Sequence, residues 1–177
     1  MGFREDYYAG INIDERKVVL VKRKRKILDE LDLMIIKELQ KDSSQSLSEI
    51  ASRINAPVST VFSRVKKMRE EGVIRGFTAV INPVVLGYNV TAIIMFSVEG
   101  AYVEDIEKQL APNPNIIALY DTTGEYDIIA IARFKSISEL DRFIKSVLKN
   151  PRIKKTITSV VLRVVKENFS GVPDRIE

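Results

Sequence analysis

The chain contains 177 residues, enough for one or two domains, and 45% of them are hydrophobic and 29% charged, as in folded globular proteins. It has no His and no Cys, which excludes disulfides, thiolate nucleophiles, imidazole general bases and most zinc or copper sites. The net charge of +4 comes entirely from residues 1–82, whereas residues 83–177 are balanced. This asymmetry is expected when one half of a chain binds a polyanion, although a solvated basic surface would produce it as well.

The first 26 residues are interpreted as a basic N-terminal extension. A short apolar run at 18–21 has the composition of a β-strand, and five adjacent cations follow it. Because neighbouring like charges repel one another, we expect the cationic run to be extended without a partner. It is either an arm along DNA phosphates or a solvated linker, and its candidate DNA contacts are Lys22, Arg23, Lys24, Arg25 and Lys26.

Apolar residues at spacings of three and four then predict three helices, at 28–41, 46–54 and 58–71. Asp29 is a suitable N-cap for the first helix. Ser46 and Glu49 have the spacing of a capping box at the start of the second. Gly72 is expected to end the third.

The third helix carries the functional signal. The Asn55-Ala56-Pro57 sequence predicts a tight turn before it, so the second and third helices have the arrangement of a helix-turn-helix. Short polar side chains would let the helix enter the major groove, and cations would reach phosphates. An ordinary three-helix domain with a solvated basic face is the alternative. The candidate DNA-binding residues are Ser59, Thr60, Ser63, Arg64, Lys66, Lys67 and Arg69.

Beyond the third helix, residues 73–74 and 77–81 predict a strand or wing, and Asn82-Pro83 predicts a turn. The pattern then changes to alternating strands and helices in the order βαββαβ, which is ferredoxin-like. One face of such a sheet is covered by two helices, and the bare face is expected to form a dimer interface. The predicted elements are 90–98, 102–110, 116–122, 127–134, 138–148 and 153–165.

Residues 28–166 closely resemble the Lrp/AsnC, or feast/famine, family of transcriptional regulators. Four stretches carry the resemblance in the family's order and spacing: residues 28–32 (LDELD), 59–68 (STVFSRVKKM) with 71–74 (EGVI), 81–87 (INPVVLG) and 123–127 (TGEYD). The resemblance implies an α+β fold, with an N-terminal winged helix-turn-helix and a C-terminal βαββαβ, ferredoxin-like or ACT-like, domain. The implied organisation is 1–26 extension, 27–76 DNA-binding domain, 77–89 hinge strand or linker, and 90–177 effector-binding and oligomerisation domain.

The same resemblance implies partners. These are double-stranded DNA, a second copy in a homodimer, and higher oligomers such as octamers. Family members often bind an amino acid in a cleft between dimers. Backbone and hydroxyl donors would hold its carboxylate, and acidic side chains its ammonium. A simple β-turn is the alternative at 124–127. The implied effector-binding residues are Gly124, Glu125, Tyr126, Asp127, Thr156 and Thr158.

Two positions depart from the family pattern. Pro57 stands where a capping Ser is usual, so the start of the recognition helix lacks a side-chain acceptor. Glu125 replaces the usual Asp, which leaves the identity of the effector open.

We expect a sequence-specific transcriptional regulator tuned by a small amino-acid-like effector, with no cofactor and no metal. The alternative is an effector-independent architectural, nucleoid-associated DNA-binding protein, which the basic arm favours slightly. An enzyme is not expected, because His, Cys and a phosphate-binding Gly-rich loop are all missing. No apolar run approaches the ~18–20 residues of a membrane helix, and no signal-peptide core is present. We therefore expect a cytoplasmic protein without a membrane partner.

Overall fold

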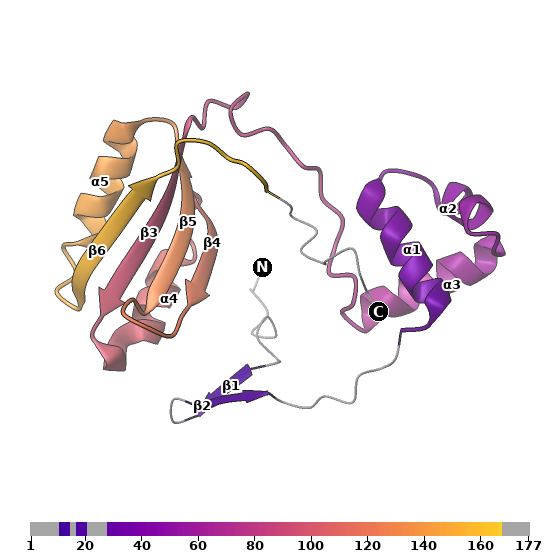
Figure 1. The fold of residues 1–177 in the computed structure, drawn as a ribbon, viewed down its shortest axis with the longest axis horizontal. Helices are drawn as coiled ribbons and strands as arrows, with labels where there is room; N and C mark the ends of the chain where they lie inside the picture. The colour runs from indigo at the N-terminus through magenta and orange to yellow at the C-terminus, as the bar shows by residue number, and fades with distance from the viewer. Residues whose placement is uncertain (1–10, 15–16, 21–27, 168–177) are drawn as a thin grey trace. The chain divides into compact units, whose positions relative to one another are not determined.

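A computed structural model describes residues 11–14, 17–20 and 28–167 (Figure 1). The chain divides into two compact units, and the boundary between them falls between Thr78 and Ala79. In the first unit, β1 (Ile11–Asp14) pairs with β2 (Lys17–Leu20) as an antiparallel hairpin. The strand-like run expected at 18–21 therefore overlaps β2. The cationic run at 22–26 lies outside the described residues.

Three helices follow as the sequence predicts: α1 (Glu30–Lys41), α2 (Leu47–Arg53) and α3 (Val58–Glu70). Asp29 caps α1 and Ser46 caps α2, each through a complete capping box. Asn55 adopts a left-handed conformation with φ of 53° in the turn before α3, as that tight turn requires. Together these features place α3 against the two preceding helices. The buried residues of this core are Ile35, Ile50, Ala51, Val61, Val65 and Met68.

The strand expected after α3 is absent from the described chain. Residues 73–81 have no regular structure, and residues 77–89 contain no hinge strand. A strand needs a neighbour to satisfy its backbone hydrogen bonds, and this segment has none within the described part of the chain. Residues 83–87 instead form a turn, in which Tyr88 N–H donates to the Pro83 carbonyl at 3.0 Å. Gly87 provides the positive φ of 84° that this turn needs.

The second unit has the predicted βαββαβ order. Its strands are β3 (Val90–Val98), β4 (Ile116–Asp121), β5 (Ile128–Phe134) and β6 (Ile153–Val160). A short 3₁₀ turn, η2 (Gly100–Tyr102), precedes α4 (Val103–Leu110), and α5 (Ile137–Val147) joins β5 to β6. The sheet order is β4-β5-β3-β6, and every pairing is antiparallel. The ferredoxin-like expectation is confirmed.

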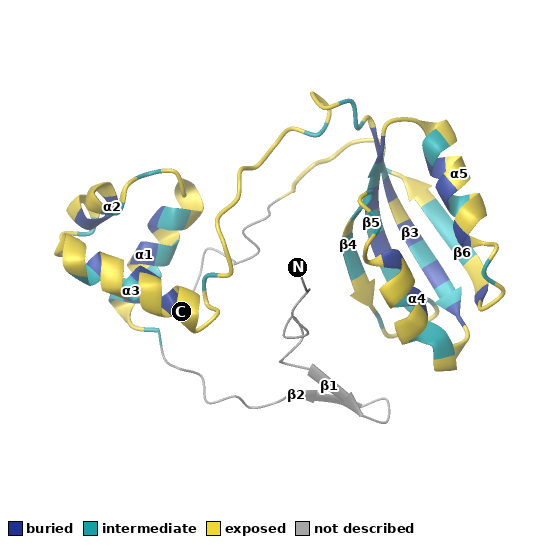
Figure 2. Cartoon of the chain, turned by 180° about the vertical axis from the view of Figure 1, so that it is seen from behind, coloured by how far each residue is buried: buried dark blue, intermediate teal, exposed yellow. Residues whose placement is uncertain are grey.

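The core of this unit lies between the sheet and the two helices, which cover one face of the sheet (Figure 2). Buried and less buried residues alternate along β3 and β5, so each strand sends every second side chain into this core. Phe96 and Phe134 are its largest fully buried side chains. No described helix covers the opposite face, which we call the open face. It presents Thr91, Ile93, Met95, Ser97, Ala118, Tyr120, Ile129, Ile131, Arg133, Lys155, Ile157 and Ser159.

Two details differ from the sequence prediction. The last strand was expected to reach residue 165 but ends at Val160. Its partner β3 begins at Val90, and the last hydrogen bond to it is donated by Val161 N–H to the Thr91 carbonyl. The helix expected at 138–148 ends at Val147, so that Leu148 is its C-cap and is exposed. Phe143 of the same helix lies in the core, where its ring centroid is 5.4 Å from that of Phe134. None of the described helices is long and apolar enough to cross a membrane.

Candidate DNA interface and effector loop

Helix α3 has two faces of opposite character. Val61, Val65 and Met68 are buried against α1 and α2, and this spacing of four and three follows the helical period. The remaining surface of the helix carries mainly hydroxyls and cations, with the exposed apolar side chains of Val58 and Phe62 among them. No acidic residue lies in its first turn, whereas Lys67 and Arg69 lie in its last. As expected for Pro57, the N-cap makes no side-chain hydrogen bond.

The short polar side chains are presented as the sequence predicted. Ser59 and Ser63 are exposed one turn apart, on the side of the helix away from its core, and Thr60 is partly buried beside them. The Ser63 hydroxyl donates to the Thr60 carbonyl at 2.9 Å, and its lone pairs remain available as acceptors. Side chains this short allow a close approach of the helix backbone to another surface.

Arg64 has a different environment from the one the sequence suggested. Its guanidinium pairs with the Asp29 carboxylate and donates to both Asp32 oxygens at 3.2 Å. Asp32 is buried, and Asp29 is the N-cap of α1, so Arg64 ties α3 to the start of α1. The backbone hydrogen bond from Asp32, followed by that of Arg64, lowers the pKa of Asp29. With two carboxylates already beside it, Arg64 is a weaker candidate for a phosphate contact than the other cations of the helix.

Those other cations are open to solvent. Lys66, Lys67 and Arg69 are all exposed on α3. Lys66 lies at the limit of an ion pair with Glu70, at 4.0 Å between two highly exposed groups, and such a pair contributes little. The cations therefore keep most of their charge available for an external anion. The predicted arm contacts at 22–26 lie outside the described residues.

Sequence reasoning missed one residue of this surface, Phe62, whose side chain is 59% exposed. The helical period could have revealed it. Residue 62 follows buried Val61 by one position, which turns it about 100° away from the core stripe.

The predicted effector residues at 124–127 lie in the loop that joins β4 to β5. Gly124 has φ of 125°, which a side chain would disfavour. Asp127 accepts a hydrogen bond from Val98 N–H at 2.7 Å, so its carboxylate fixes the loop to the end of β3. The Thr122 hydroxyl donates to the Tyr126 carbonyl at 2.8 Å. Asp127 thus has a structural role, and Glu125 is the freer acidic group.

Strand β6 contributes a different residue to this loop than the sequence predicted. Thr156 and Thr158 pair with Phe96 and Ile94, so their side chains lie on the helix-covered face of the sheet. Lys155 instead meets the loop. Its ammonium lies 3.6 Å from the Glu125 carboxylate and 5.5 Å from the Tyr126 ring centre. These neighbours raise the pKa of Lys155, Tyr126 contributing most. A cation of β6 and an anion of the loop thus lie side by side.

Two family models together cover most of the chain. A winged helix-turn-helix DNA-binding model matches residues 28–75, and the Lrp/AsnC ligand binding domain model matches residues 91–170. An uncharacterized HTH-type transcriptional regulator of Pyrococcus abyssi is 47% identical over 147 residues, which are 83% of this chain and 100% of that protein. The chain belongs to the Lrp/AsnC family.

Two further similar proteins agree with this assignment. The HTH-type transcriptional regulator FL11 of Pyrococcus furiosus is 41% identical, covering 81% of this chain and 95% of its own length. The solved feast or famine regulatory protein of M. tuberculosis, complexed with L-methionine, is 25% identical, with a TM-score of 0.77 and coverage of 83% of this chain and 100% of that one. The Lrp/AsnC chain described here is a DNA-binding transcriptional regulator and not an enzyme.

Proposed function

We propose that this regulator binds specific DNA sequences through α3 and that a small amino-acid-like effector tunes its affinity. The observation that carries the proposal is the outer surface of α3. Hydroxyls at Ser59 and Ser63 stand next to cations at Lys66, Lys67 and Arg69 that have little internal compensation. Hydroxyls can exchange hydrogen bonds with base edges, and cations bind phosphates. Arg64 is assigned to the fold of the domain instead.

The effector proposal rests on the loop between β4 and β5. An amino acid carries an ammonium and a carboxylate, and the Glu125–Lys155 pair presents one group suited to each. Gly124 leaves the backbone beside this pair open, because a side-chain carbon added at this position would meet no atom within 4 Å. The L-methionine complex of the M. tuberculosis relative favours an apolar amino acid as the first ligand class to try. Thr156 and Thr158 have a smaller part in this proposal, since they face the other side of the sheet.

We also propose a homodimer, formed by the open faces of two copies. Ile93 and Tyr120 of this face are 37% and 49% exposed, which is costly for side chains of their size if left in water. A two-fold symmetric pair would bury both copies of the same patch. A dimer would also present two α3 helices to two half-sites of one DNA. Higher assemblies such as octamers remain part of the proposal, as does a cytoplasmic location.

Lys67→Ala provides the first test of the DNA proposal. Fluorescence anisotropy would follow binding to the DNA upstream of the protein's own gene and to a scrambled duplex, across a salt series. When a phosphate contact is lost, fewer counterions are released on binding. We therefore expect the magnitude of the slope of log K against log salt to fall by about one for each protomer. Lys145→Ala is the matched control, since Lys145 is an exposed lysine on α5, paired with Asp141.

The same titration separates the alternatives. Preference of roughly 10³ or more for the native duplex, shifted by added amino acids, supports the effector-tuned regulator. Equal binding to both duplexes, unmoved by amino acids, supports the architectural alternative. An unchanged slope for Lys67→Ala would remove α3 from the phosphate contacts.

A further inference from the structure

Phe62 is a large apolar side chain on a surface that is rich in hydroxyls and cations. One turn away along α3, on either side, lie Ser59 and Lys66. Single exposed phenylalanines are common on protein surfaces. This one, however, lies in the first half of the recognition helix, the part that reaches base edges in helix-turn-helix proteins.

The fold of this unit does not use the Phe62 ring. The core residues that α3 supplies are Val61, Val65 and Met68, whereas Phe62 is 59% exposed. Val58, one turn before it, is also 47% exposed, so the two side chains form a small apolar strip along the helix. Such a strip lies outside the core that packs the three helices, and phosphate contacts alone would not require it.

The major groove contains one apolar group that matches this strip. Thymine exposes its C5-methyl group there, and none of the other three bases carries a methyl group at the major-groove edge. We propose that Phe62 reads thymine by covering this methyl group when α3 lies in the major groove. The inference rests on the proposed DNA binding by α3 and adds to it a named base and a residue that selects it.

The chemistry of the alternatives defines the specificity. At its major-groove edge, cytosine presents an amino group that donates hydrogen bonds. A phenyl ring cannot accept such a hydrogen bond as an oxygen atom would. Deoxyuridine keeps every hydrogen-bonding atom of thymidine and lacks only the methyl group. A contact with the methyl group is therefore lost in deoxyuridine, whereas a contact with the thymine oxygen is kept.

The experiment combines Phe62→Ala with deoxyuridine substitution. The full-length wild-type protein first selects its preferred duplexes from a randomised library. Each thymidine of the selected site is then replaced singly by deoxyuridine, and affinities are measured for wild type and variant. Covering one methyl-sized group contributes a factor of about four in affinity. We expect deoxyuridine to weaken wild-type binding by about that factor at one position of each half-site, and to leave Phe62→Ala binding unchanged there.

Lys67→Ala serves as the comparison, because loss of a phosphate contact should weaken binding to thymidine and deoxyuridine duplexes equally. Circular dichroism melting of Phe62→Ala should match wild type, since the ring lies outside the core. An equal deoxyuridine penalty in wild type and Phe62→Ala, or no penalty at any thymidine in wild type, would overturn the inference. If selection yields no preferred sequence at all, sequence-specific binding itself fails, and the two failures are thereby distinguished.

Discussion

At the scale of single residues, a cluster of three charged side chains joins α1 to α2. Glu38 on α1 is nearly buried and pairs with Lys41 on its own helix and with Arg53 of α2 at 3.2 Å. The hydrogen bond from Lys41, followed by that from Arg53, lowers the pKa of Glu38 below its ordinary value of 4.5. A carboxylate whose pKa is lowered in the folded state makes the free energy of unfolding depend on pH.

Glu38→Gln should reveal that dependence. A carboxylate whose pKa is lowered on folding stabilises the fold at pH values above its pKa in the unfolded chain. This contribution is lost as the pH falls through its pKa in the folded protein. We therefore expect wild type to lose thermal stability below about pH 4.5. The variant should melt at a lower temperature at pH 7 and show a shallower decline in acid. Melting followed by circular dichroism between pH 7 and 3 measures this.

Glu104→Gln is the control, because Glu104 is a highly exposed carboxylate on α4 that pairs only loosely with Lys108, at 3.7 Å. The acid profile of this variant should follow wild type. Identical acid profiles for wild type and Glu38→Gln would mean that the Glu38 cluster does not contribute to the acid sensitivity.

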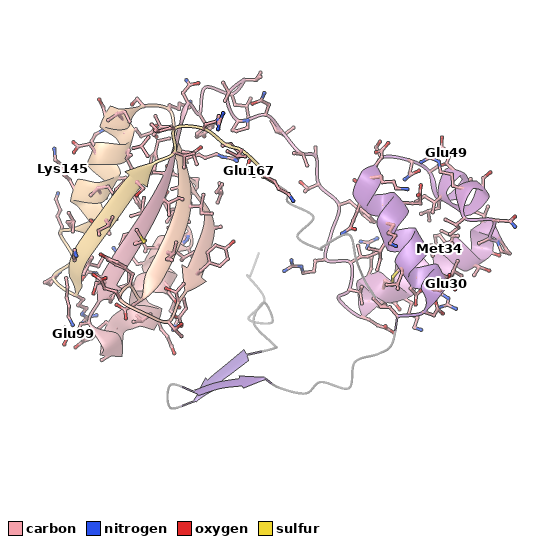
Figure 3. All side chains as sticks on the ribbon, viewed as in Figure 1. Glu30, Met34, Glu49, Glu99, Lys145 and Glu167 are labelled. Atoms are coloured by element: carbon pink, nitrogen blue, oxygen red, sulfur yellow. The ribbon has the colours of Figure 1, made fainter. Side chains whose placement is uncertain are left out.

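At the scale of elements, the caps of the three helices differ in a way that suits their roles. Helices α1 and α2 begin with complete capping boxes and with acidic residues, Glu30 and Glu49, in their first turns (Figure 3). Helix α3, whose N-cap is Pro57, has neither feature. We therefore expect the positive end of its dipole to favour an external anion such as a DNA phosphate.

Ser46→Ala tests the capping box of α2. Its hydroxyl accepts from Glu49 N–H at 3.2 Å, and its own N–H donates to the Glu49 carboxylate at 2.7 Å. Loss of an N-cap hydroxyl costs about 1 kcal/mol of unfolding free energy. Urea denaturation should show this loss for Ser46→Ala and none for Ser48→Ala, an exposed serine in the first turn of the same helix. Equal midpoints for the two variants would mean that the cap does not stabilise α2.

At the scale of the whole molecule, the open face is the surface through which we propose that two copies associate. Ile131 pairs with Ile93 across β5 and β3, and Met95 pairs with Ile129 beside them. This apolar group is continuous across neighbouring strands, with no described helix to cover it. The Arg133–Glu167 ion pair, 2.6 Å long, lies at its border, and Glu167 comes from the segment that follows β6 (Figure 3).

Ile131→Asp should convert the proposed dimer into a monomer. A carboxylate at the centre of the patch would be desolvated in both copies, while in the free chain it stays in contact with water. Size-exclusion chromatography with light scattering should give the mass of one chain for Ile131→Asp and of two or more for wild type. Leu148→Asp, at an exposed apolar residue of α5, should behave as wild type. A folded Ile131→Asp that keeps the wild-type mass would place the interface elsewhere.

The sequence by itself determined most of the elements and the class of protein. Helix caps at Asp29 and Ser46, the turn before α3 and the alternation in β3 are local signals, set by the hydrogen bonding and spacing of nearby residues. The helical period of the apolar residues likewise predicts which hydroxyls and lysines of α3 are exposed. The segment at 77–81 shows where local signals fail, because its β-type composition has no partner strand in the described chain.

Only the tertiary structure decided which charges are already paired. In the sequence, Arg64 is one of several cations along α3. In the structure, its guanidinium donates hydrogen bonds to Asp29 and Asp32, more than thirty positions earlier. Strand register placed Lys155 rather than Thr156 beside the loop at 124–127, since a shift of one residue along a strand reverses the face of the sheet. Such contacts join residues far apart in the chain, and local periodicity carries no information about them.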